Sequence, residues 1–150
     1  MIPLELSPSL KSQIESEGSA AFPAECCGIL IGRDIRDGDK VRRVIERLMP
    51  GQNVFEPEEQ YHRFSIDPRL QMQAEREAEK SGQTVLGFYH SHPNHPARPS
   101  EYDRAHGWPF YSYVIVSIMD RVAAAMTSWV LNDQTEQFDE QPIRVTPASS

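Results

Sequence analysis

The chain has 150 residues, and its 22 acidic and 15 basic side chains give a formal net charge of −7 at pH 7. An acidic surface repels the phosphates of nucleic acids and of anionic membranes, so we expect neither as the main partner. The sequence has no apolar run of the roughly 20 residues that a membrane helix needs, and no signal peptide, so we predict a cytoplasmic protein.

The length is sufficient for one core, because a chain of this size buries about 68–70% of its unfolded surface. We predict a single domain over residues 1–150, with residues 146–150 as a frayed tail. The only cysteines, Cys26 and Cys27, are adjacent, which fits neither a disulfide framework nor a zinc knuckle. We interpret them as two small packing residues, one of which faces the core.

The N-terminal part predicts a helix followed by a β-hairpin. Ser7 suits an N-cap because proline follows it at the first helical position, and Gly18 is expected to end the helix. A strand is predicted over residues 27–33. Asp37-Gly38 then turns the chain into a second strand at about 40–48.

Residues 49–63 predict a long polar loop, a candidate flap over a functional site. Asn53 and His62 lie on it, and we interpret both as structural or exposed rather than catalytic. A short strand at residues 64–66 and a helix over residues 67–81 are predicted to follow.

Strand signals dominate the second half of the chain. They cover residues 84–90, 111–117, 122–131, 136–138 and 143–145. Ala123-Ala124-Ala125 favours a helix by propensity, but the flanking turns and Trp129-Val130-Leu131 favour a strand. Strands mixed with helices before and between them predict an α+β fold, with a mixed β-sheet sandwich or partial barrel flanked by helices.

His90-Ser91-His92-Pro93 ends the first of these strands with two imidazoles. Because a strand alternates its side chains, both rings point to one side while the serine points away. Three prolines within residues 93–99 stiffen the loop that follows. Ser100 and Asp103 then have the spacing of a helix N-terminus, and Gly107 ends this short helix.

These side chains have the types and spacing of an open zinc site. Catalytic zinc typically takes three protein ligands and keeps a fourth position for water, and His90, His92 and Asp103 would supply the three. Each feature alone has a simpler explanation, since a lone histidine is more often a core or rim residue, and Ser100-x-x-Asp103 could be only a capping box. Their combination favours a metal site.

Two further histidines lie close to this motif. His95 is interpreted as facing solvent, although it could offer a spare ligand. His106, one turn beyond Asp103, could instead face the site and contact a metal ligand without binding the metal itself.

The pattern His-x-His-Pro, six residues, then Ser-x-x-Asp resembles the signature of the JAMM (JAB1/MPN/Mov34) metalloprotease family, in its small prokaryotic type. Residues 25–32, Glu-Cys-Cys-Gly-Ile-Leu-Ile-Gly, also resemble the family's N-terminal Glu-x-x-Gly-x-Leu-x-Gly segment. The likeness runs from about residue 5 to 145 and implies a JAB1/MPN-like, cytidine-deaminase-like fold.

The resemblance also implies roles for the site residues. One Zn²⁺ per chain would be held by His90, His92 and Asp103, with Glu25 as general base and Ser100 as hydrogen-bond donor to the attacking water or the oxyanion. Sequence physics alone does not distinguish Glu25 from the other acidic residues, so its role depends on the resemblance.

By the same resemblance the chain would be a zinc-dependent metallopeptidase. It would hydrolyse a peptide or isopeptide bond after the C-terminal Gly-Gly of a ubiquitin-like or sulfur-carrier protein, with zinc-bound water as nucleophile. Two alternatives stay open, namely an inactive MPN scaffold that binds protein partners and a zinc amidohydrolase acting on a small molecule. A nucleobase deaminase would be expected to show Pro-Cys-x-x-Cys, which Cys26-Cys27 does not provide.

Overall fold

The computed structural model describes residues 1–53 and 65–147, and these residues form a curved β-sheet with three helices. The strands are β1 Leu4–Leu6, β2 Cys27–Asp37, β3 Lys40–Gly51, β4 Thr84–Pro93, β5 Ser112–Met119, β6 Val122–Asn132, β7 Gln137–Gln141 and β8 Ile143–Val145. The helices are α1 Pro8–Ala21, α2 Pro68–Lys80 and α3 Glu101–His106. No helix among the described residues is long and apolar enough to cross a membrane.

The strand order is β7-β6-β5-β4-β2-β3-β1-β8, so the two outermost strands are neighbours in the sequence. Only Pro142 separates β7 from β8, and its carbonyl accepts a 2.8 Å hydrogen bond from the N–H of Leu4 in β1. The chain therefore joins one edge of the sheet to the other. Parallel pairs (β4 with β5, β1 with β3 and β8) and antiparallel pairs coexist, as in the predicted mixed partial barrel.

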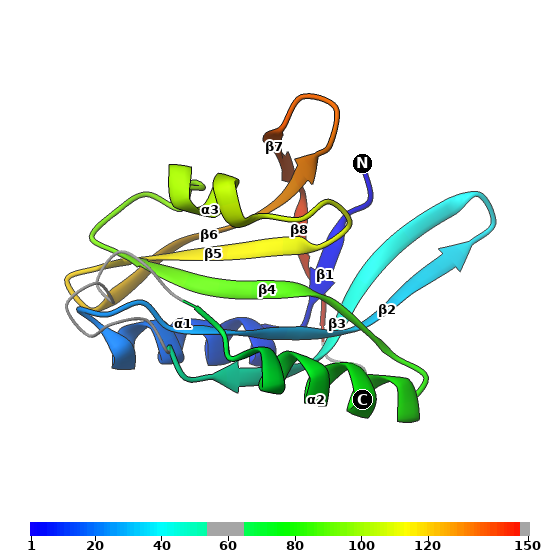
Figure 1. The fold of residues 1–150 in the computed structure, drawn as a ribbon, viewed down its shortest axis with the longest axis horizontal. Helices are drawn as coiled ribbons and strands as arrows, with labels where there is room; N and C mark the ends of the chain where they lie inside the picture. The colour runs from blue at the N-terminus through cyan, green and yellow to red at the C-terminus, as the bar shows by residue number, and fades with distance from the viewer. Residues whose placement is uncertain (54–64, 148–150) are drawn as a thin grey trace.

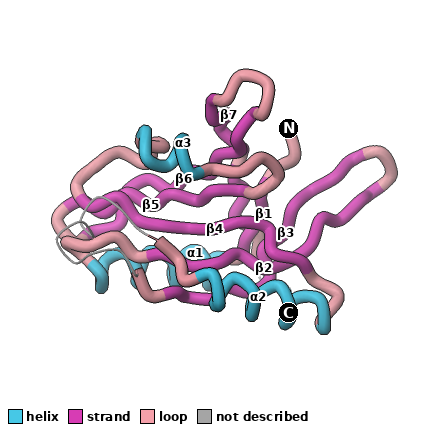
Figure 2. Tube along the Cα trace, viewed as in Figure 1, coloured by secondary structure: helices cyan, strands magenta, loops and turns pink. Residues whose placement is uncertain are grey.

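Helices α1 and α2 pack into separate apolar clusters on opposite faces of the sheet. Figure 1 draws both of them below strand β4. Leu30 in β2 belongs to the apolar cluster that includes Ile14 of α1. Its neighbours Ile29 and Ile31 belong to the cluster that includes Ala74 of α2. Because adjacent strand residues point to opposite faces, the central strands are buried on both sides. In Figure 2 the strands, coloured magenta, make up most of the molecule, and the helices, coloured cyan, lie outside the sheet.

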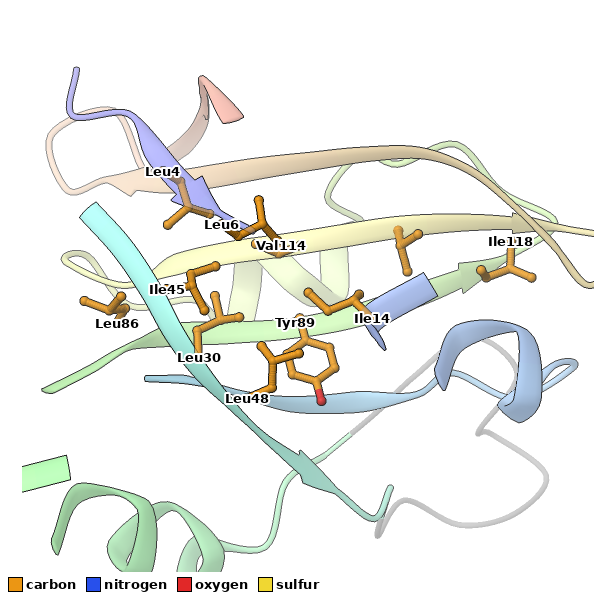
Figure 3. Close-up of a cluster of buried hydrophobic side chains, with 11 residues drawn as sticks. Leu4, Leu6, Ile14, Leu30, Ile45, Leu48, Leu86, Tyr89, Val114 and Ile118 are labelled. Carbon is orange, nitrogen blue, oxygen red and sulfur yellow. The ribbon is translucent and has the colours of Figure 1, made fainter. Parts of the chain in front are cut away.

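The larger cluster gathers the side chains of Ile14, Leu30, Leu48 and Tyr89, all buried (Figure 3). Tyr89 is fully enclosed, and its hydroxyl donates a 2.6 Å hydrogen bond to Glu17 of α1. A buried phenol needs such a partner, so this contact fixes α1 against β4.

Most predicted elements are confirmed. The predicted helix at 67–81 is α2, with Asp67 as its N-cap, and the ambiguous alanine run lies in strand β6. The predicted hairpin joins β2 to β3 through Gly38-Asp39, one residue later than expected. The tail at 146–150 is only partly described, and there the N–H of Thr146 is hydrogen-bonded to Leu6.

Two predictions need correction, and one strand was missed. The first helix does not end at Gly18 but continues to Ala21. Gly18 is buried within the helix, where an added Cβ would lie 2.8 Å from Ile118, so this glycine serves packing and not helix termination. The short strand β1 was not predicted. The strand predicted at 64–66 is wrong for the described residues 65 and 66, which lie in coil, while Phe64 falls outside the described residues.

Two other predictions concern neighbouring segments. The loop predicted at 49–63 begins later than expected, since β3 continues to Gly51, and most of the candidate flap, with His62, lies outside the described residues. Cys27 is buried in the core and Cys26 is partly buried beside it, as the packing interpretation expects. Burial raises the pKa of both thiols, to about 11 for Cys26 and about 12 for Cys27, so neither is a ready metal ligand at neutral pH.

We predict that Gly28→Ala strongly destabilises the fold. A Cβ at this position would lie 2.2 Å from the Tyr89 ring, which cannot retreat because its hydroxyl is tied to Glu17. The free energy of unfolding, measured by urea denaturation, should fall by about 3 kcal/mol. The control Gly38→Asn replaces a turn glycine with no neighbour within 4 Å and a φ that asparagine tolerates, and should change it by less than about 1 kcal/mol. Equal losses in both variants would contradict the clash.

Candidate functional site

Strand β4 places two imidazoles side by side at its C-terminal end. It is paired with β2 along one edge and with β5 along the other, and both rings are buried. The Nε2 atoms of His90 and His92 lie 3.1 Å apart, which agrees with the predicted common orientation.

Helix α3 brings a carboxylate to the same point. Ser100 is its N-cap, its Oγ accepts a 3.1 Å bond from the N–H of Asp103, and Asp103 Oδ2 accepts a 2.9 Å bond from the N–H of Ser100. This is the capping box that the sequence allowed as a simpler explanation. The same Oδ2 also lies 3.3 Å from Nε2 of His90 and 3.3 Å from Nε2 of His92. Capping and convergence therefore occur together.

The three atoms form a triangle with sides of 3.1, 3.3 and 3.3 Å. Ligand atoms about 2.0–2.2 Å from a tetrahedral zinc ion are roughly 3.3–3.6 Å from one another. The three side chains predicted as zinc ligands thus fit that ion closely. The structure brings them together, and their assignment as ligands stays a prediction.

A hydrogen bond at Nδ1, the ring nitrogen that does not face Asp103, fixes the orientation of His92. This Nδ1 lies 2.9 Å from the carbonyl of Pro96, so Nδ1 carries a proton and Nε2 is the ring nitrogen that faces Asp103. The loop that supplies this carbonyl is itself held, because Ser117 donates a 2.6 Å bond to the carbonyl of His95 and Thr127 donates a 2.6 Å bond to that of Ala97.

The protonation states of Asp103 and His90 suit a cation. Burial would raise the pKa of Asp103, but the charge and hydrogen bonds of His90 and His92 and the Ser100 N–H hold it far below its usual range. Burial lowers the pKa of His90. Burial also acts to lower the pKa of His92, but contacts with Asp103 and Pro96 raise it overall. At neutral pH the carboxylate is ionised and available.

A second carboxylate, Glu25, lies just before β2. It is buried, and one of its oxygens lies with ring nitrogens of His90 and His92 within 4.8 Å of one another. Burial raises the pKa of Glu25 to about 8, with His92 opposing this shift and Asp103 adding to it. The two carboxylates near the histidines therefore differ sharply in proton affinity. Glu25 is the one in the range where a proton can be taken up and released at neutral pH.

Backbone contacts hold Glu25 in place. Next to it, the N–H of Cys26 donates a 2.8 Å bond to Ser91, whose side chain points away from the imidazoles as predicted. Asn53 donates a 3.4 Å bond to the Glu25 carbonyl and accepts one from the N–H of Ser65. Asn53 thus has a structural contact, in line with its interpretation from the sequence.

Two cavities flank the cluster. One, of about 360 Å³, is bordered among the described residues by Glu25, His92, His95, Pro96, Arg98, Ser100 and Tyr102. The other, of about 280 Å³, is bordered by Ser65, Ile66, Gln71, Phe88, His90, Tyr102, Asp103, His106, Trp108 and Tyr113. A substrate can therefore approach the three converging atoms from two sides.

The two further histidines are exposed and border these cavities. The Nδ1 of His106 lies 2.8 Å from the carbonyl of Tyr102, whose ring it stacks on, so this contact is with Tyr102 rather than with a predicted ligand. The aromatic residues Tyr102, Trp108 and Tyr113 were not predicted at the site. Their clustering in residues 102–113 is the only signal that the sequence offered.

Known proteins resemble the chain in sequence and in fold. Residues 7–132 match the family described as prokaryotic homologs of the JAB domain. A desampylase of Haloferax volcanii is 37% identical over 111 residues, which is 72% of this chain and 73% of that protein. A solved protein of Desulfitobacterium hafniense is 33% identical with a TM-score of 0.80, over 97% of this chain and 94% of that one.

The JAB1/MPN domain protein AF2198 of Archaeoglobus fulgidus aligns over 95% of this chain and 99% of its own, with a TM-score of 0.58 and 21% identity. At that identity the likeness concerns the fold alone. It confirms the predicted α+β, JAB1/MPN-like fold.

We predict that Ser117→Ala weakens zinc binding. Without the Ser117 hydroxyl the loop that orients His92 loses one of its two side-chain anchors, and zinc affinity should fall about three- to tenfold. The measurement is competition between the protein and a chromophoric chelator. Ser128→Ala is the matched control, because Ser128 is equally buried but bonds to Gln141. Both variants should lose about 1 kcal/mol of stability. Equal zinc affinities in the two variants would exclude a role for the anchor.

We also predict that Glu25→Gln stabilises the metal-free protein as the pH rises. With a pKa raised from 4.5 to about 8, the folded state of the wild type binds more protons than the unfolded state between these values, so its stability falls across that interval. Glutamine does not titrate and escapes this loss. The gap in melting temperature, measured with a chelator present, should widen from pH 5 to pH 8 and amount to several degrees at about pH 8. Parallel curves would show that Glu25 is not desolvated.

Proposed function

Because the chain belongs to the prokaryotic homologs of the JAB domain, the JAMM family, we propose that it is a zinc-dependent peptidase of isopeptidase type. Its substrate would be a peptide or isopeptide bond after the C-terminal Gly-Gly of a ubiquitin-like or sulfur-carrier protein. The prediction of a JAMM-type enzyme is confirmed at the level of the family. The observation that carries the proposal is the convergence of His90, His92 and Asp103 within 3.3 Å, with Glu25 beside them.

His90, His92 and Asp103 would hold one zinc ion per chain. When bound, such an ion lowers the pKa of a water molecule toward about 7 and polarises the substrate carbonyl. These three side chains suit the task because Asp103 is ionised and His92 Nε2 is oriented by the bond from Nδ1 to Pro96. The proposal also accounts for a polar cluster that would otherwise be costly to bury.

Glu25 would move the proton. It would take one from the attacking water as the new C–O bond forms, and return it to the leaving nitrogen as the C–N bond breaks. The carboxylic acid and amine that result exchange the acid's proton, which gives a carboxylate and an ammonium. A general base works best when its pKa lies near the operating pH. Burial raises the pKa of Glu25 toward that range, whereas Asp103 is shifted in the opposite direction.

Ser100 would stabilise the negative charge that develops on the carbonyl oxygen. Its Oγ accepts the capping bond from the N–H of Asp103, which leaves the hydroxyl proton free to be donated to another group. Ser100 and Glu25 border the same cavity, so one substrate group can reach both. Preorganised donors of this kind typically contribute a factor of about 10²–10³ in kcat.

A diglycine tail has no side chains, so its backbone can come close to the buried side chains of Glu25, His90 and His92. The relative named a desampylase supports a protein conjugate as the substrate class. An inactive scaffold is the alternative with the clearest test, which is elemental analysis of protein purified without chelators. Zinc well below one per chain, with no activity gained on adding it, would favour the scaffold.

We predict that Glu25→Gln and Asp103→Asn separate the roles of the two carboxylates. Glu25→Gln should keep stoichiometric zinc but lower kcat by about 10²–10⁴ on a Gly-Gly-extended carrier protein, because the proton carrier is lost. Asp103→Asn should lose most of the zinc, because an ionised ligand is removed. Zinc content is measured by elemental analysis and cleavage by mass spectrometry.

Two outcomes would contradict these assignments. Full activity in Glu25→Gln would refute the proposed base. Loss of zinc from Glu25→Gln with retention in Asp103→Asn would make Glu25 the third ligand, an arrangement its distance to both imidazoles allows.

A further inference from the structure

The cavity bordered by Trp108 is lined by mostly different residues from the cavity of Glu25 and Ser100. Among the described residues it shares only Tyr102 with that cavity, and it touches the converging cluster through His90 and Asp103. Most of its other walls are apolar. They are formed by Ile66, Phe88, Tyr102, Trp108 and Tyr113. No lysine or arginine borders it among the described residues.

The aromatic walls are held in place by contacts among themselves. Phe88 stacks on Tyr113 with a centroid distance of 5.9 Å and meets Tyr111 edge-on at 5.1 Å. The Tyr113 hydroxyl accepts a 2.8 Å hydrogen bond from the N–H of Trp108. The Trp108 side chain is 68% exposed, so a ligand in the cavity can still cover it. The cavity is therefore preformed, with one uncovered aromatic surface at its edge.

We propose that this cavity binds the aliphatic stem of the lysine whose ε-nitrogen is joined to the diglycine. This inference rests on the proposed function and adds the leaving-group class to it. Glycine residues have no side chains to fill an aromatic cavity, so the occupant comes from the other side of the scissile bond. In an isopeptide the four methylenes of lysine begin directly at the scissile nitrogen. They would therefore begin beside the converging cluster, which this cavity touches through His90 and Asp103.

The size and polarity of the cavity agree with this occupant. About 280 Å³ accommodates one side chain but no folded element. Aromatic faces cover methylene groups well, and a newly formed ammonium is attracted to the same faces.

The test compares leaving groups on one diglycine carrier. The carrier is joined to the ε-amine of a lysine in a short peptide, to the α-amine of a glycine, or to the α-amine of a phenylalanine. In Trp108→Ala, the ratio of kcat/KM for the lysine conjugate to that for the glycine conjugate should fall about tenfold, mainly through KM, because only lysine has a stem to lose contacts. Phe110→Ala is the control, because Phe110 is 56% exposed in the same connection but does not border the cavity. Its ratio should equal that of the wild type.

Several results would overturn the inference. These are an unchanged ratio in Trp108→Ala, an equal fall in Phe110→Ala, or a wild-type preference for the phenylalanine conjugate that Trp108→Ala removes. Failure of the proposed function looks different, because the zinc-loaded wild type would then cleave none of the three conjugates. The subsite is then tested by binding alone, and calorimetry with Glu25→Gln must show tighter binding of the lysine conjugate than of the glycine conjugate. Equal affinities would overturn it.

Discussion

The candidate site depends on the pairing of β4 along both of its edges. With β2 on one side and β5 on the other, this strand cannot shift without breaking two hydrogen-bond ladders. A slip of one residue would turn Ser91 toward Asp103 and both imidazoles away from it. The pairing therefore holds the two Nε2 atoms 3.1 Å apart, close enough to share one ion. Rigidity of the central sheet is what makes the cluster possible.

Two carboxylates lie near the same imidazoles, yet their environments push their pKa values in opposite directions. Asp103 receives a backbone N–H and the histidine contacts, which favour its charged form. Glu25 is mainly desolvated, which favours its neutral form. Pairs of this kind commonly separate an electrostatic role from a proton-transfer role. The difference comes from which element supplies each residue, since Asp103 sits at a helix N-terminus and Glu25 on the chain entering a buried strand.

The sequence predicted those features of the fold that depend on residues close to one another in the chain. The N-caps Ser7, Asp67 and Ser100 act within one turn, and all three helices begin where these residues indicate. The end of α1 and strand β1 depend on distant partners, namely Ile118 for Gly18 and the parallel neighbours of β1, so local signals failed there. The same division holds in the site. Its three predicted ligands are close in the sequence, whereas Glu25 was identified only by family resemblance and the aromatic cavity not at all.

The short helix α3 has only six residues, yet it supplies Asp103 to the site. Six residues do not form a stable helix alone, so Asp103 must be held by what flanks it. After the helix, the N–H of Trp108 is tied to Tyr113, and the carbonyl of Phe110 accepts a 2.7 Å bond from the buried Arg43. Arg43 also pairs with Asp34 at 2.9 Å, which joins the connection to the β2–β3 hairpin. The contacts that fix Asp103 beside the histidines therefore also fix the backbone of Trp108, so the triangle of His90, His92 and Asp103 is connected to the aromatic cavity.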